Sequence, residues 1–177
     1  MSVFLSFVLR HKPEEIGVSL NNEGWTNIET LITQANKRGE QFTKAIINQI
    51  VAEDKKGRYQ ISEDGSMIRA VQGHSTKQVD LTFVEKTPPH TLYHGTSKKF
   101  MHLIESSGLL PQTRQYVHLS ADLKTAKTVG MRHAKVESDL VILKINTREM
   151  LANEFKFQLA DNGVWLVKNV PFEFITI

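Results

Sequence analysis

An arginine–histidine pair stands near the start of the chain, directly after an apolar stretch. Arg10 and His11 follow the residues MSVFLSFVL. In one interpretation, these cationic side chains satisfy the last carbonyls and the dipole of a helix. In the other, they form an anion site, where arginine donates a forked pair of hydrogen bonds to a phosphate and histidine supplies a further donor. The pair alone leaves both interpretations open.

Two more arginines belong to a predicted pair of strands. Arg58 begins the first strand and Arg69 lies near the end of the second. An exposed wing with solvated charges would explain them, but the residues that follow offer amide, imidazole and hydroxyl groups around a glycine that lets the backbone approach a ligand. These residues are Gln72, Gly73, His74 and Ser75.

A third group of polar residues comes later in the chain. His94, Gly95 and Thr96 are placed at the end of a predicted strand, with Ser97 as the cap of the next helix. A strand end, a glycine and a helix N-terminus form a natural phosphate or nucleotide site, although a capped turn with a structural histidine explains them equally.

A polar face is predicted for the following strand. Arg114, Tyr116, His118 and Ser120 alternate along the chain, so a strand would present all four side chains on one side. A half-buried strand usually has apolar groups on its inner face. The pattern therefore favours a cleft, with a solvated sheet edge as the alternative.

Composition narrows the classes of protein that could carry these groups. The chain has 177 residues, 40% of them hydrophobic, and no cysteine, which excludes disulfides and thiolate metal sites and fits a cytoplasmic protein. The formal net charge is +3 with seven histidines, and the pI is about 9.1, which suits a polyanionic partner. No apolar run reaches the length of a membrane span, and charged residues interrupt the N-terminal apolar stretch before any cleavage site of a signal peptide.

The elements that must position the first two groups have a helical and then a strand-like periodicity. Helices are predicted at 2–11 with Ser2 as cap, at 28–36 opened by Thr26 or Asn27, and at 44–53 capped by Thr43. Strands at 58–62 and 67–71 flank a hairpin turn. Three helices before a two-stranded ribbon predict a winged-helix lobe at 1–72.

The rest of the chain predicts a mixed lobe with more strands than helices. The segment 73–90 is interpreted as a connection that holds one short alternating stretch, Val79–Val84, and the second lobe covers 91–177. Its strands are expected at 91–94, 116–120, 140–145, 163–167 and 172–177, and its helices at 98–107 and 123–132. Neither a Rossmann glycine motif nor a P-loop is present.

Along almost its whole length, the chain resembles the RNA 2′-phosphotransferase family. The matching phrases are Leu5-Ser6-x-x-Leu9-Arg10-His11, Asn22-Glu23-Gly24-Trp25, Asp54-Lys55-Lys56-Gly57-Arg58-Tyr59, Ile68-Arg69-Ala70-x-Gln72-Gly73-His74-Ser75, Leu92-Tyr93-His94-Gly95-Thr96, Arg114-x-x-Val117-His118-Leu119-Ser120, Val129-Gly130-x-Arg132-His133 and Asn162-Gly163-Val164-Trp165-Leu166. The chain departs from the family's pattern at Val3, Val71 and Ala134, where lysine, asparagine and glycine are usual.

The resemblance implies an α+β protein in which a winged-helix RNA lobe is joined to an ADP-ribosyltransferase-like NAD lobe, with the reaction in a basic pocket between them. The implied catalytic tetrad is Arg10, His11, Arg58 and Arg114. The implied NAD ligands are His94, Gly95, Thr96, His118, Ser120 and Arg132. Further substrate ligands would be Arg69, Gln72, His74 and Ser75.

The reaction that the resemblance implies has two steps. An internal RNA 2′-phosphate attacks the ribose carbon that bears the nicotinamide of NAD, and nicotinamide leaves. The neighbouring 2″-hydroxyl then attacks the phosphorus, which gives RNA with a free 2′-hydroxyl and ADP-ribose 1″,2″-cyclic phosphate. Arginine forks can stabilise the phosphate charge, so we expect no metal requirement and no obligate protein partner.

Two other functions would use some of the same features. A winged-helix DNA-binding regulator would explain the first lobe and the basic pI, but not a polar face that includes Arg114 and His118. A protein-modifying ADP-ribosyltransferase commonly uses a late glutamate, for which Glu154 and Glu173 are the candidates.

Overall fold

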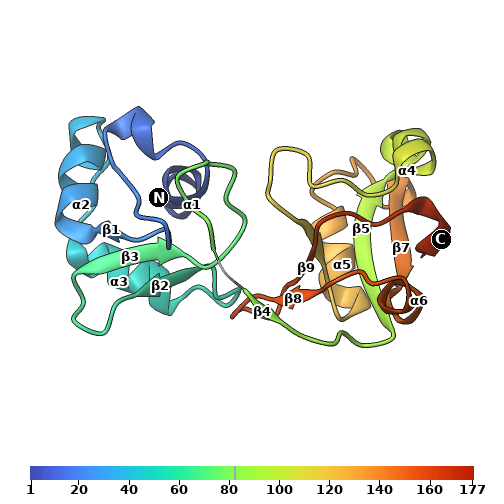
Figure 1. Cartoon of the computed structure of the whole chain (residues 1–177). Coiled ribbons are helices and arrows are strands. Elements are labelled where there is room, and N and C mark those ends of the chain that lie inside the picture. The colour runs from blue at the N-terminus through green and yellow to red at the C-terminus, as the bar shows by residue number, and fades with distance from the viewer. Residues whose placement is uncertain (82) are drawn as a thin grey trace. The chain divides into compact units, whose positions relative to one another are not determined.

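The computed structural model describes residues 1–81 and 83–177. The chain divides into two compact units, Met1–Thr82 and Phe83–Ile177, and each is described by itself. Both contain helices and antiparallel strands, which confirms the predicted α+β class (Figure 1). Part of the alternating stretch Val79–Val84 lies outside the described residues, because it includes Thr82.

Among the described residues, the first unit contains helices and three short strands. Its elements in chain order are α1 (Ser2–Arg10), the 3-10 helix η1 (Pro13–Ile16), β1 (Thr26–Asn27), α2 (Ile28–Lys37), α3 (Lys44–Ala52), β2 (Tyr59–Ile61) and β3 (Met67–Ala70). The Asn27 side chain accepts the N–H of Thr30 and the Thr43 side chain accepts that of Ile46, which confirms both predicted caps. Ser2 was expected to cap α1 but lies inside it, and its hydroxyl bonds elsewhere in the unit.

A small sheet closes the first unit, with the strand order β1-β3-β2. The hairpin β2–β3 was predicted. The two-residue β1 was not, because a strand of this length carries no periodicity; Thr26 pairs with Ile68 on β3. Leu5, Val8 and Leu9 of α1 are buried in this unit, so the apolar face of α1 is part of its core.

Residues 73–81, expected to belong to a connecting segment, pack on the first unit. Val79 and Leu81 are buried, and the Asp80 N–H donates to the Asn22 carbonyl at 2.9 Å. The first compact unit therefore extends about ten residues beyond the predicted lobe, because the segment contributes apolar side chains to the core.

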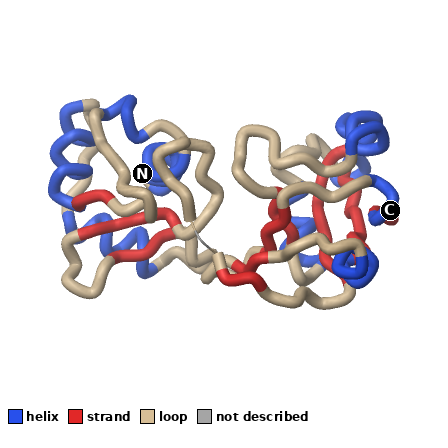
Figure 2. The backbone as a smooth tube through the Cα atoms, viewed as in Figure 1, coloured by secondary structure: helices blue, strands red, loops and turns tan. Residues whose placement is uncertain are grey.

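The second unit is built mainly of strands. Its elements are β4 (Val84–Glu85), β5 (Thr91–Ser97), η2 (Lys98–Phe100), α4 (Met101–Ser107), β6 (Val117–Leu119), α5 (Leu123–Gly130), η3 (Glu137–Asp139), β7 (Leu140–Asn146), α6 (Thr147–Ala152), β8 (Gln158–Leu159), β9 (Trp165–Val167), η4 (Phe172–Phe174) and β10 (Ile175–Thr176). Two antiparallel sheets result, β10-β7-β5 and β4-β8-β9-β6 (Figure 2). A bridge between Tyr93 and Ser120 connects them.

One apolar core holds these two sheets together. Leu92, Leu143 and Ile145 contribute from the first sheet and Trp165 and Val167 from the second. The elements missed by sequence analysis, such as α6 and β8, are short. The predicted strand 172–177 is wrong in its first half, which forms η4 after Pro171, because proline fixes φ and favours the start of a helical turn.

Candidate functional site

The end of α1 and the loop after β3 bring together the first predicted group. The Ser75 N–H donates to the carbonyl of Arg10 at 2.9 Å, and Nδ1 of His11 lies 2.9 Å from Oγ of Ser75. Gly73 has φ +87° and packs against the Arg10 guanidinium, so this left-handed position favours glycine. The structure thus places Arg10, His11 and Ser75 side by side from segments more than sixty residues apart.

His74 is buried beneath this group. Its exposed fraction is 3%, and its Nε2 has no hydrogen-bond partner within the described residues. Burial, followed by the positive charges of Arg10, His11 and Arg69, lowers its pKa from 6.5 to about 4. His74 is therefore neutral near pH 7, and the cations that lower its pKa are the ones predicted to bind substrate.

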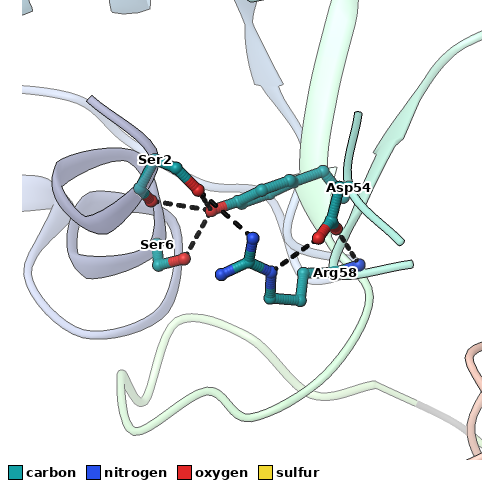
Figure 3. Close-up of polar contacts among 5 residues, drawn as sticks. Ser2, Ser6, Asp54 and Arg58 are labelled. Carbon is teal, nitrogen blue, oxygen red and sulfur yellow. Dashed lines mark hydrogen bonds and ion pairs between the residues drawn. The ribbon is translucent and has the colours of Figure 1, made fainter. Parts of the chain in front are cut away.

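Arg58 is held by a different network (Figure 3). Its Nε donates to Oδ1 of Asp54 at 2.8 Å, its Nη2 donates to Oγ of Ser2 at 3.3 Å, and its backbone N–H donates to Oδ2 of Asp54. The Tyr59 hydroxyl joins the same network, because it donates to the Ser2 carbonyl at 2.8 Å and bonds to the Ser6 hydroxyl. The guanidinium is therefore fixed in direction before any ligand arrives.

This network ties Arg58 to the first turn of α1, whereas Arg10 lies at its last turn. Ser2 and Arg10 are eight residues apart on α1, a rise of about 12 Å. In the first unit, Arg10 and His11 thus lie at the end of α1, whereas Arg58, just before β2, contacts the start of α1. Arg114, the fourth member, belongs to the second unit.

The carboxyl group of Asp54 is suited to hold a cation. Its side chain is 3% exposed, and burial alone would raise its pKa. The hydrogen bonds from the backbone and guanidinium of Arg58, with the guanidinium's charge, outweigh burial and lower the pKa below 3.8. Asp54 therefore stays ionised at neutral pH, and the stability that its charge contributes is lost only as the pH falls below about 4.

Arg69 is also held within the first unit. Its Nε and Nη2 donate to Oε1 of Gln60 at 2.9 and 2.7 Å, and its guanidinium lies 4.7 Å from the centroid of the Trp25 ring. Gln72, also predicted as a substrate ligand, is buried. The substrate-binding roles of both residues stay predictions.

In the second unit, His94 has a defined tautomer. Its Nδ1 lies 3.0 Å from the carbonyl oxygen of His118, which can only accept, so Nδ1 carries the proton. Burial lowers the pKa of His94, the bond to His118 opposes this, and the charges of His133 and Arg114 lower it further. The ring is thus neutral near pH 7, and Nε2 can accept a hydrogen bond from a ligand hydroxyl.

Gly95 and Thr96 occupy a different position from the one predicted. They lie inside β5, which continues to Ser97, and both are buried. A Cβ built on Gly95 would lie 2.0 Å from the carbonyl oxygen of Ala126 and 2.8 Å from the nitrogen of Gly130, both on α5. Gly95 therefore allows α5 to pack directly on β5, and this packing explains the glycine without a ligand. Ser97 forms no side-chain cap.

Arg114 does not share the strand face that the alternation predicted. β6 covers only Val117–Leu119, and Arg114 lies in the preceding turn, where its N–H donates to the carbonyl of Pro111 at 3.0 Å. Loss of hydration around the guanidinium, followed by the positive charge of Arg132, lowers the pKa of Arg114. The charges of His133 and Arg114 act on His94, and the charge of Arg132 acts on Arg114, so cationic side chains gather in this part of the second unit, which favours an anionic ligand.

The remaining predicted NAD ligands lie close to His94. His118 is on β6 and offers its carbonyl to the His94 ring, while Ser120 forms the bridge between the sheets through two 2.8 Å backbone bonds with Tyr93. Their NAD-binding roles, and that of Thr96, stay predictions.

Sequence analysis missed several residues of these two sites. Asp54, Ser2 and Tyr59 support Arg58, and His133 adds positive charge near His94. For Asp54 a signal was present, namely an acidic residue four positions before an arginine in a matching phrase. Ser2 and Tyr59 carried none, since their contact joins segments 57 residues apart.

The described residues offer neither a metal-binding cluster nor a membrane-spanning helix. No three histidine, aspartate or glutamate side chains of residues 1–81 and 83–177 come together in a group that could hold a metal ion. Within the same ranges, no helix combines the length and apolar character that crossing a bilayer requires.

Comparison with known proteins agrees with the resemblance. Residues 1–169 match the model of the RNA 2′-phosphotransferase, Tpt1 / KptA family. The RNA 2′-phosphotransferase of Escherichia coli K12 is 51% identical over 174 residues, which cover 98% of this chain and 92% of that protein. A probable RNA 2′-phosphotransferase of Pectobacterium carotovorum is 53% identical over 175 residues, 99% of this chain and 92% of that one. The chain belongs to the RNA 2′-phosphotransferase family.

Proposed function

We propose that this enzyme removes an internal 2′-phosphate from RNA and transfers it to NAD, giving RNA with a 2′-hydroxyl, nicotinamide and ADP-ribose 1″,2″-cyclic phosphate. The observation that carries the use of an anionic dinucleotide is the neutral ring of His94, which the carbonyl of His118 fixes through Nδ1 and on which the charges of His133 and Arg114 act. We further propose that the first unit is a winged-helix RNA lobe, the second an ADP-ribosyltransferase-like lobe, and the cytoplasm the site of action.

Within this proposal, the first unit binds the phosphate of RNA. Ser75 bonds to the backbone carbonyl of Arg10 and to the ring of His11, so the end of α1 that carries both side chains is held in place before RNA binds. Arg58 is fixed by Asp54 through Nε, and its remaining N–H groups can donate to phosphate oxygens. An anionic nucleophile needs orientation and charge stabilisation more than a base, which is what such groups supply.

The second unit would hold NAD, which supplies an electrophilic ribose carbon and a cationic leaving group. The residues present fit such a ligand. Nε2 of His94 could accept a hydrogen bond from a ribose hydroxyl, and Arg114 and Arg132 would donate to phosphate oxygens. Bound phosphate would also relieve the repulsion between these two arginines.

A reconstituted assay tests the proposal. The protein is incubated with NAD and a short RNA that carries one internal 2′-phosphate, and RNA and NAD products are followed together. We expect nicotinamide release and loss of the 2′-phosphate in equal amounts, unchanged by EDTA. RNA of the same sequence without the 2′-phosphate is the control and should release no nicotinamide.

Other outcomes would replace the proposal. Labelling of a protein mixture from NAD, lost on substitution of Glu154 or Glu173, would identify a protein-modifying transferase. Sequence-specific binding to duplex DNA without NAD turnover would identify a regulator. Loss of activity in EDTA that magnesium restores would contradict the metal-free mechanism.

A further inference from the structure

A pocket of about 440 Å³ lies at one end of the sheet β10-β7-β5 in the second unit. It is lined by the first residues of β5, the last residues of β7, the start of α6 and one residue of β10, which are His90, Thr91, Lys144, Ile145, Asn146, Arg148 and Thr176. Figure 1 shows α6 at the end of β7 where these segments meet. Neither the proposed reaction nor the family phrases use any of these residues.

The chemistry of the lining is that of a phosphate site. Lys144 and Arg148 are exposed cations, His90 adds a third titratable nitrogen, and Thr91 and Thr176 add hydroxyls. No carboxylate lines the pocket; the nearby Glu149 carboxylate instead accepts from the Asn146 amide at 2.8 Å. Converging donors of this kind recognise phosphate oxygens.

The pocket is separate from the His94 group. Along β5 the side chains alternate between the two faces of the sheet, so Thr91 projects to the opposite face from His94. Lys144 pairs with Tyr93 across the sheet and lies on the Thr91 face. Towards the other end of this face, α5 packs directly on Gly95, so the pocket lies at the end of the face that is away from this contact.

We propose that this pocket binds a phosphodiester of the RNA chain, away from the reacting 2′-phosphate. The lining contains no phenylalanine, tyrosine or tryptophan ring on which a base could stack, and its cations and hydroxyls suit backbone phosphate, so it would bind RNA without reading sequence. The inference rests on the proposed RNA substrate. If the pocket binds RNA in this way, the affinity of the protein for RNA depends on the length of the RNA, because only a longer RNA reaches this second phosphate contact.

A binding measurement tests the site without catalysis. The full-length protein is titrated with a fluorescent 20-nucleotide RNA that lacks a 2′-phosphate, and the Kd is measured by anisotropy at several salt concentrations. In the double variant Lys144→Gln and Arg148→Gln, we expect the Kd to rise about three- to tenfold. The slope of log Kd against log salt should fall in magnitude by about 0.7 to 1.4, because one or two phosphate contacts are lost.

A matched control removes the same charge elsewhere on the unit. Lys98→Gln with Lys99→Gln lies beyond the opposite end of β5 and should leave the Kd nearly unchanged. Equal weakening in both double variants would overturn the inference in favour of diffuse charge attraction, and so would no weakening in either. If inorganic phosphate or AMP binds at Lys144 and Arg148 while RNA affinity is unaltered, the pocket takes a small phosphate ligand instead, which also overturns it.

Turnover separates this inference from the proposed function. The Lys144→Gln and Arg148→Gln variant should keep its kcat and show a raised KM only for long 2′-phosphorylated RNA, with no change for a dinucleotide. If the unsubstituted enzyme does not remove 2′-phosphates at all, the proposed function fails, whereas the RNA titration still decides the site.

Discussion

The cations of the two units are held in opposite ways. In the first unit Arg58 bonds to Asp54 and Ser2, Arg69 bonds to Gln60, and His11 bonds to Ser75. In the second unit Arg114 is exposed in the turn before β6, and the like charge of Arg132 acts on it. The first set is ordered before a ligand arrives, whereas we expect Arg114 to be ordered by the ligand itself. Preorganised donors favour transition-state stabilisation, so Arg114 should lose more conformational freedom than Arg58 when it takes part in the reaction.

The largest expected effect concerns how the tetrad divides its work. In the proposed reaction, the second step needs a hydroxyl to attack a phosphodiester, so charge would grow on the phosphorus oxygens. Arg58→Ala, His11→Ala and Arg114→Ala should each slow this step by about 10²–10³ and the first step less, so ADP-ribosylated RNA accumulates. His94→Ala should suppress the first step through weaker NAD binding. A gel time course of labelled RNA follows the 2′-phosphorylated substrate, the ADP-ribosylated intermediate and the 2′-hydroxyl product. Accumulation of substrate alone in every variant would contradict the division.

His74 predicts a pH dependence of stability in the first unit. Its pKa is about 4 in the folded protein against 6.5 ordinarily, so between these values the unfolded chain binds a proton that the folded chain does not. The free energy of unfolding should therefore decrease as the pH is lowered from 6.5 to 4, by up to about 3 kcal/mol. Urea unfolding at pH 7 and pH 4.5 measures it, and His74→Gln should reduce the difference. Parallel pH profiles in the two proteins would contradict the assignment.

Asp54 offers a smaller and more selective test. Asp54→Asn keeps the size of the side chain but removes the charge that holds Arg58, so we expect about tenfold lower kcat, a value at the scale of a charged hydrogen bond. The KM for NAD should not change. In an Arg58→Ala background the same substitution should cost no further activity, because its effect passes through Arg58. Additive losses in the double variant would show that Asp54 supports the fold only.

The smallest expected effect is that of Arg132→Gln, which should raise the stability of the protein and weaken the binding of NAD. Arg132→Gln removes the charge that lowers the pKa of Arg114, so the ligand-free protein should gain a few tenths of a kcal/mol, the scale of exposed charge pairs. The KM for NAD should rise. Thermal unfolding with and without NAD gives both values, and Lys135→Gln, at an exposed position shortly after Arg132, is the control. A less stable variant would mean that the two arginines do not repel each other.

The sequence predicted elements better than the contacts between them. Helices α2 and α3, with caps at Asn27 and Thr43, follow from local periodicity and capping chemistry. The role of Ser2 could not be predicted, because its hydroxyl bonds to Arg58, 56 residues away. Gly95 was assigned to a strand end because glycine usually marks a turn, yet the helix packed on it required the absence of a side chain. Arg114 was placed on a strand because alternation continues through a turn as readily as through a strand.

The packing of α5 on β5 has a mechanical consequence. A Cβ built on Gly130 would lie 2.5 Å from a methyl carbon of Leu140 and 2.9 Å from the Cα of Gly95, so helix and strand meet backbone to backbone with no side chain between them. Arg132 follows α5 by two residues, and His94 precedes Gly95 by one. The distance between the backbones of Arg132 and His94 is therefore set by main-chain packing. Such a distance varies less than one that depends on side-chain conformations. A side chain at Gly95 or Gly130 would therefore push α5 away from β5 and change the distance between Arg132 and His94.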